Sequence, residues 1–304
     1  MGTLSPKNQE HVKPSASVII AGYYSSSTLA ITLDSLAEQS CQDFETIFIN
    51  SSQEVESEKI IKLHFPWVRF HQHPHRLLMH EARNQGAAKA RGDLLIFSDP
   101  DIRIHPKWVE KMLASFHSGA RCMVGEMDSQ STNWVGVGIH LVKFHEHLAG
   151  IRVAPQIAPT ASAAYDRSLF EQIGGFEGTK VCGDAIISWQ VRELGIPIVR
   201  VKNVAVQHIH DHTMSRLIRE RKNRGKEFIV ERMSFENWNI YKIFFHILLF
   251  PAAVIYVCLI AGNNARRAGW FWRYLKTFPV QLLGQSAWCW GECLGQIKTL
   301  RGRV

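Results

Sequence analysis

The chain has 304 residues, with 35 Lys and Arg against 27 Asp and Glu, so its formal charge at pH 7 is +8. An apolar content of 46% over this length suffices for a substantial buried core. These values exclude a disordered chain, a collagen-like repeat and a small disulfide scaffold.

The N-terminal segment, up to about residue 15, is polar, and we expect a flexible arm there and no signal peptide. The six cysteines include no CxxC pair. We therefore expect reduced thiols in a cytosolic chain, and no metal site built from cysteine.

In the first half of the chain, short apolar runs alternate with amphipathic segments. This alternation predicts an α/β fold with a mainly parallel sheet that is covered by helices on both faces. A further helix begins at Pro106, and later strands lie near Arg121–Glu126 and Pro197–Val201. The first four strands are expected at Ser17–Ala21, Phe44–Asn50, Val68–His71 and Asp93–Ser98, and the helices between them at Leu29–Gln39, Glu54–Leu63 and Met79–Ala90.

In open sheets of this kind, ligands bind beyond the carboxyl ends of the strands. The residues that directly follow the strands therefore matter most. Gly22 and Tyr23 follow the first strand, and Asn50 ends the second. We assign all three to the binding of a ligand.

Asp99 and Asp101 follow the fourth strand and are separated by Pro100. Two carboxylates at this spacing can hold Mg²⁺ or Mn²⁺, which prefer oxygen ligands. Surface turns are also rich in Asp and Pro, so the pair by itself fits an ordinary turn as well. Its position after a buried strand favours the metal site.

Arg83 lies upstream, in a helix with several small residues. Its planar guanidinium could bind a phosphate or the edge of a base, and a solvated helix face is an equal alternative.

Several motifs in a fixed order resemble the family 2 glycosyltransferases of the GT-A fold, a Rossmann-like architecture. The resemblance covers about two thirds of the chain, from Ser17 to Gly225. The motifs are SVIIAGYY, FETIFINSS, EARNQGAAKARGDLLIFSDPD, SAAYDRSLFEQIGGFEG, GDAIISWQVRELG and VQHIHDHTMSRL.

The resemblance implies a role for each matching residue. Asp99 and Asp101 form the family's DxD motif, which holds the metal that bridges the donor diphosphate. Arg83 and Asn50 would lie near the donor nucleotide. Asp184 would be the general base that takes the proton of the acceptor hydroxyl, in a single displacement that inverts the anomeric carbon. As a simpler alternative, Asp184 only caps a helix.

A histidine motif is expected near this site. His208 and His210 match a V-x-H-x-H pattern of the family, and either could complete the metal or diphosphate site. Histidines beside apolar strands also often only form hydrogen bonds within the fold.

The sequence departs from the family pattern at two positions. Asn50 stands where relatives have an aspartate that contacts the donor base, so the identity of the base is open. Gly183 stands before Asp184 where relatives have another acid.

The C-terminal part has a different composition. Ser215–Arg232 is basic and amphipathic, and Ile243–Ala261 carries no formal charge and is about long enough to cross a bilayer. Phe278–Ile297 is a second apolar stretch, which contains Glu292 and is rich in Gly, Trp and Cys. A spanning hairpin would place Arg266 and Arg273 outside, against the positive-inside tendency. Interfacial helices, or a re-entrant segment bent at Pro251, avoid this conflict, and a buried core hairpin is a further alternative.

The sequence thus predicts a flexible N-terminus (residues 1–15), a GT-A catalytic domain (16–232) and a membrane-associated helical appendage (233–304). We expect an inverting, metal-assisted transferase that uses a nucleotide-sugar donor. Its acceptor would be a glycan or a lipid-linked sugar in the synthesis of cell-surface polysaccharide or glycolipid. It would work at the cytoplasmic face of the plasma (inner) membrane and bind no nucleic acid.

Two other classes of function stay open. The departures at Asn50 and Gly183 favour a catalytically silent GT-A-like module that is recruited to a membrane. The clusters around His73 and His210 could form a zinc hydrolase if they met in one site.

Overall fold

The computed structural model describes residues 13–131, 133–209 and 213–302. The chain divides into two compact units, Met1–Asp128 with Arg152–Ile209, and Ser129–Ile151 with His210–Val304. These limits differ from the domain limits expected from the sequence, because residues 129–151 group with the C-terminal helices. The two units are described separately below.

The first unit is built on an eight-stranded sheet with the strand order β3-β2-β1-β4-β7-β6-β8-β5. The strands β1 to β4 pair in parallel, whereas β7 pairs antiparallel with β4 and β6, and β5 pairs antiparallel with β8. The strands are β1 (Ala16–Gly22), β2 (Phe44–Asn50), β3 (Val68–Gln72), β4 (Leu94–Ser98), β5 (Ile102–Arg103), β6 (Cys122–Ser129), β7 (Ser162–Asp166) and β8 (Ile198–His208).

Burial explains why these segments form strands. Every residue of β1, β2 and β4 is buried, as expected for parallel strands that are covered on both faces. Burial and strand pairing together confirm the predicted fold class, an α/β fold with a mixed, mainly parallel sheet and helices. β8 extends beyond the expected Pro197–Val201 segment, as far as His208.

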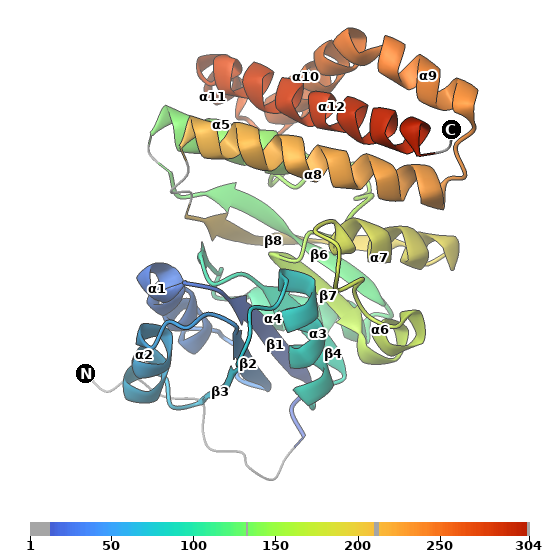
Figure 1. Cartoon of the computed structure of the whole chain (residues 1–304). Helices are drawn as coiled ribbons and strands as arrows, with labels where there is room; N and C mark the ends of the chain where they lie inside the picture. Colours follow the sequence, from blue (N-terminus) through green and yellow to red (C-terminus); the bar gives the residue numbers. More distant parts are fainter. Residues whose placement is uncertain (1–12, 132, 210–212, 303–304) are drawn as a thin grey trace. The chain divides into compact units, whose positions relative to one another are not determined.

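In the described part of the first unit, six helices accompany this sheet (Figure 1). α3 packs on β1 and β2, and Gly86 makes this packing close, because a Cβ atom there would lie 2.4 Å from Ile19 Cγ2. The sheet therefore holds α3, and with it Arg83, at a fixed depth. The helices are α1 (Ser26–Ala37), α2 (Glu56–His64), α3 (Met79–Lys89), α4 (Trp108–His117), α6 (Arg167–Ile173) and α7 (Gly183–Glu193), and α5 (Trp134–Phe144) belongs to the second unit.

The described part of the second unit is helical. α12 packs along α8, and glycines allow the two backbones to approach: a Cβ atom at Gly291 would lie 2.1 Å from the carbonyl oxygen of Lys222. Besides α5, the helices of this unit are α8 (Met214–Phe235), α9 (Ile240–Leu248), α10 (Phe250–Arg267), α11 (Phe271–Lys276) and α12 (Phe278–Arg301).

The expected apolar segment Ile243–Ala261 is broken at Leu249, between α9 and α10, and Pro251 stands in the first turn of α10. Among the described helices, none has by itself the length and hydropathy to cross a bilayer. Taken together, α9 and α10 have the required length and hydropathy, but the two helices are bent by 72° relative to each other.

Candidate functional site

The loop after β4 carries the two carboxylates of the expected metal site. β4 is buried throughout and ends at Ser98, whereas Asp99 and Asp101 are only partly buried. The strand thus fixes the backbone, and the two side chains extend beyond its carboxyl end.

A short strand brings His208 to the same place. β5 follows Asp101 directly and pairs with the end of β8, so that Ile102 lies opposite His208. The backbone N–H of Ile209 also donates a hydrogen bond of 2.9 Å to the carbonyl oxygen of Asp101. The register of this small antiparallel pair therefore places a buried imidazole beside the carboxylates.

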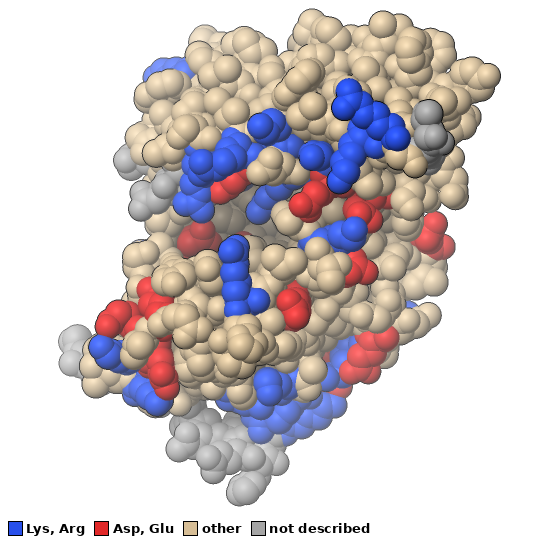
Figure 2. Space-filling view, in the orientation of Figure 1, with Lys and Arg blue, Asp and Glu red and all other residues tan. Residues whose placement is uncertain are grey.

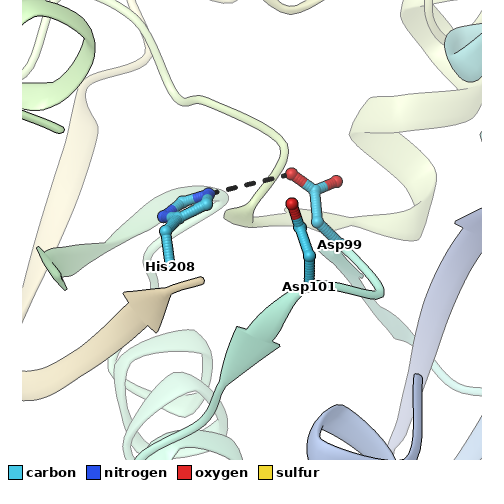
Figure 3. Close-up of side chains that lie close together, drawn as sticks. All are labelled: Asp99, Asp101 and His208. Carbon is cyan, nitrogen blue, oxygen red and sulfur yellow. Dashed lines mark ion pairs between the residues drawn. The ribbon is translucent and has the colours of Figure 1, made fainter. Parts of the chain in front are cut away.

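Asp99, Asp101 and His208 each offer one ligand atom, and these atoms all lie within 4.8 Å of one another (Figure 3). His208 Nε2 is 4.0 Å from Asp99 Oδ2. Ligands on opposite sides of one Mg²⁺ ion are about 4.2 Å apart, so the spread of the three atoms is of the right order for a single ion. Two carboxylates with one imidazole also suit Mn²⁺, and the residues present therefore fit a divalent cation.

Arg83 lies on the other side of Asp99. Its side chain is fully buried, and its Nη2 donates to Asp99 Oδ1 in an ion pair. Its Nε and Nη1 atoms are buried without a hydrogen-bond partner among the described residues. A buried guanidinium with unused donors can bind an anionic oxygen that enters the site.

Asn50 is buried at the end of β2, and its amide group is already engaged. Its Nδ2 donates to Gln72 Oε1 at 2.9 Å and to the carbonyl oxygen of Glu54 at 3.3 Å. Its Oδ1 accepts from the backbone N–H of Ser52 at 3.2 Å and from the Ser52 hydroxyl at 2.9 Å. In this structure Asn50 thus holds the loop after β2, and its contact with a donor base stays a prediction.

Gly22 lies opposite Asn50 in the register of β1 and β2. A Cβ atom at Gly22 would lie 2.2 Å from the ring of Phe48, so the end of β1 has no room for a larger residue. Tyr23, the next residue, is 43% exposed, and the guanidinium carbon of Arg76 stands 4.6 Å from the centre of its ring. A ligand can therefore reach the phenol ring of Tyr23.

Asp184 lies in the first turn of α7 and is partly buried. Its Oδ1 accepts a hydrogen bond of 2.9 Å from the backbone N–H of Ala185. The cap position itself is Cys182, so Asp184 is not the cap residue of α7. Asp184 is not one of the three residues that form the metal cluster.

Close packing against His80 explains why a glycine, Gly183, stands before Asp184. A Cβ atom at Gly183 would lie 2.8 Å from the ring of His80. The acid that relatives carry at this position would therefore displace the imidazole.

His210 lies outside the described residues, so its role stays a prediction.

Two residues that sequence reasoning missed are Gln72 and Arg76. Gln72 Oε1 accepts a hydrogen bond from Asn50, and its Nε2 donates a hydrogen bond of 2.8 Å to the carbonyl oxygen of Ser52. Neither residue stands in a motif, and only the pairing of β2 with β3 could have pointed to Gln72, because it lies opposite Asn50.

Comparison with known proteins bears on the family and on the fold of the chain. The model of a family described as glycosyl transferase family 2 matches residues 17–174. The search of curated proteins finds no match.

Two solved structures show the same fold at low sequence identity. A mannosyltransferase, PcManGT from Pyrobaculum calidifontis, in complex with GDP-Man and Mn²⁺, has a TM-score of 0.59 and 14% identity, over 92% of this chain and 88% of that one. GalNAc-T7 with UDP, GalNAc and Mn²⁺ has a TM-score of 0.52 and 18% identity, over 66% of this chain. The alignment spans 44% of the length of GalNAc-T7.

Proposed function

The chain belongs to glycosyl transferase family 2, and from this premise we propose that it transfers a sugar from a nucleoside-diphosphate donor to an acceptor hydroxyl, with Mn²⁺ or Mg²⁺ as cofactor. The observation that carries the proposal is the group formed by Asp99, Asp101 and His208 at the end of β4. When bound there, the cation would neutralise the negative charge that develops on the leaving diphosphate.

The residues around the metal group would hold the donor. Two buried nitrogens of Arg83, Nε and Nη1, have no hydrogen-bond partner among the described residues, which suits an oxygen of the diphosphate. Tyr23 offers an accessible aromatic face, and Asn50 with Gly22 shapes the loop in which the base would lie. The complexes of PcManGT with GDP-Man and Mn²⁺ and of GalNAc-T7 with UDP and Mn²⁺ support a donor of this class.

We assign the acceptor proton to Asp184. Its carboxylate would take the proton from the acceptor hydroxyl as that oxygen forms a bond to the anomeric carbon. Attack from the face opposite the leaving diphosphate inverts the configuration of that carbon.

The acceptor that we propose is a glycan or a lipid-linked sugar, in the synthesis of cell-surface polysaccharide or glycolipid at the cytoplasmic face of the plasma membrane. The second unit supports this with exposed apolar side chains on every helix from α9 to α12, among them Phe244, Leu259, Trp272 and Trp290. Helices of this kind lie in the interfacial layer of a bilayer.

Release of nucleoside diphosphate from a panel of nucleotide sugars tests the proposal. With Mn²⁺ we expect release from at least one donor, loss of release in excess EDTA, and a fall of at least about 100-fold in Asp101→Asn, because one ligand of the metal is lost. In Asp184→Asn, donor binding should persist while transfer falls by about 100-fold or more. Unchanged transfer in Asp184→Asn would remove this residue as the base.

The second candidate, a silent binding module, rests on Asn50 and Gly183, the two departures from the family pattern. Both have structural reasons, because Asn50 forms hydrogen bonds within its loop and Gly183 packs against the ring of His80. Calorimetry separates the two functions, because a silent module would show neither turnover nor Mn²⁺-dependent binding with any donor of the panel.

A further inference from the structure

The second unit contains a groove between α10, α11 and the start of α12. Its volume is about 480 Å³, within the range of sites for small ligands. Gly262 lies in its wall, next to the ring of Tyr274. The remaining lining includes Ile255, Cys258, Leu259, Phe271, Leu275 and Phe278.

The rim of the groove is apolar and exposed. Leu259 is 67% exposed and Leu275 is 44% exposed, whereas Cys258 and Tyr274 at its base are buried. In the face that Figure 2 shows, most of the surface over the C-terminal helices is uncharged, and Lys and Arg side chains gather along α8. The lining of the groove carries one charged side chain, that of Arg266. A hydrocarbon chain could therefore enter the groove from a surrounding apolar layer without burying a charge.

One end of the groove carries a cation. Arg266 lines it, is exposed, and bonds through Nη2 to Asn263 Oδ1 at 3.1 Å. Within the described residues, Arg266 has no carboxylate partner. Glu292 is the only acidic residue between residues 240 and 302, and it is buried. The charge beside the groove is thus positive and available to an anion.

We propose that this groove binds one hydrocarbon chain of an anionic membrane phospholipid, with the lipid phosphate at the guanidinium of Arg266. The apolar lining matches the chain, and the cation at the rim matches the phosphate. The site deepens the proposed membrane association, and it is independent of glycosyl transfer.

Titration calorimetry of the full chain with decyl phosphate, below its micelle concentration, tests the site. We expect saturable binding of one molecule per chain. Affinity should rise about fourfold for each added methylene from hexyl to decyl phosphate, because each methylene leaves water. Neutral decyl maltoside should bind at least about tenfold more weakly, since it lacks the charge-assisted contact.

Two pairs of variants locate the binding. Arg266→Gln should weaken decyl phosphate about tenfold, whereas Arg267→Gln, the same change in the same turn of α10 but outside the groove, should change it less than about twofold. Leu259→Trp should obstruct the groove, and Leu248→Trp, at an equally exposed position of α9, should not. Circular dichroism establishes that each variant is folded.

Equal effects within each pair, or binding that does not saturate, would overturn the proposal in favour of general adsorption. A dimer that dissociates on Leu259→Trp would show that a second copy covers the groove, and the proposal would be wrong. Sedimentation with phosphatidylcholine vesicles, with and without phosphatidylglycerol, separates lipid binding in the groove from membrane association of the whole chain. If vesicles bind and decyl phosphate does not, the groove fails while membrane association stands.

Discussion

Asp99 takes part in two interactions. The carboxylate pairs with the buried Arg83 and also belongs to the metal group. Asp101, two residues further along the loop, belongs to the same metal group. The two aspartates of one motif should therefore differ in what they do for stability.

We expect Asp99→Asn to lower the free energy of unfolding by about 3 kcal/mol without metal, because it leaves the Arg83 guanidinium buried without its counter-charge. Asp101→Asn should cost clearly less, although both variants weaken Mn²⁺ binding. Denaturant titration in EDTA checks the first point, and calorimetry with Mn²⁺ checks the second. Equal loss of stability in both variants would contradict the assigned role of the Arg83 pair.

A second residue, Glu45, is buried at the start of β2. Burial acts to raise its pKa, but hydrogen bonds from the Ser17 hydroxyl, the Arg91 backbone and the Arg69 guanidinium outweigh it, so the pKa lies below the usual value. The folded state therefore holds the ionised form more strongly than the unfolded state does. Its contribution is present at neutral pH and is lost as the pH falls through the folded pKa.

Glu45→Gln should consequently lower the melting temperature at pH 7, by an amount equal to about 1–3 kcal/mol. The difference should begin to shrink as the pH falls below the usual glutamate pKa of about 4.3, and the variant and the parent chain should converge only below the lowered folded pKa, where the parent carboxylate is protonated. Thermal melts from pH 7 to pH 3 measure this, and a constant difference across the range would contradict it. Glu56→Gln, at an exposed position, is the control.

At the scale of elements, periodicity predicted most of the sheet. The runs in β1, β2 and β4 are continuous and apolar, which is typical of strands buried on both faces. β5 was missed, because two residues carry no periodic signal. This short strand nevertheless brings His208 to the aspartates.

The packing of α3 on β1 depends on a small residue. Gly86→Ala would place a Cβ atom 2.4 Å from Ile19 Cγ2. We expect a loss of about 1–3 kcal/mol of stability from overpacking, and weaker donor binding because Arg83 lies on the same helix. Ala88→Ser, an exposed change on α3, should be nearly neutral in denaturant titrations.

For the whole molecule, the net charge of +8 is unevenly distributed along the sequence. Between residues 240 and 302 the chain has several Lys and Arg residues and one acidic residue, the buried Glu292. The exposed charge of this region is therefore almost wholly positive, beside exposed apolar side chains. Such a surface should recognise anionic lipid by two physically separable forces.

Sedimentation with vesicles that contain phosphatidylglycerol separates these forces. Raising NaCl from about 0.1 M to about 1 M shortens the screening length from about 10 Å to about 3 Å, so we expect binding to weaken several-fold. A residual, salt-resistant part should persist through the apolar side chains. Binding that is wholly insensitive to salt would contradict the electrostatic component.

The sequence by itself determined the order of the motifs, the buried strands and the place of the two aspartates at a strand end, because burial and periodicity are properties of contiguous residues. The tertiary structure decided which distant residues meet. The pairing of β5 with β8 added His208 to the metal group, strand β3 brought Gln72 to Asn50, and residues 129–151 joined the C-terminal helices. Such contacts depend on strand register and on helix packing between segments far apart in the chain, which local patterns do not specify.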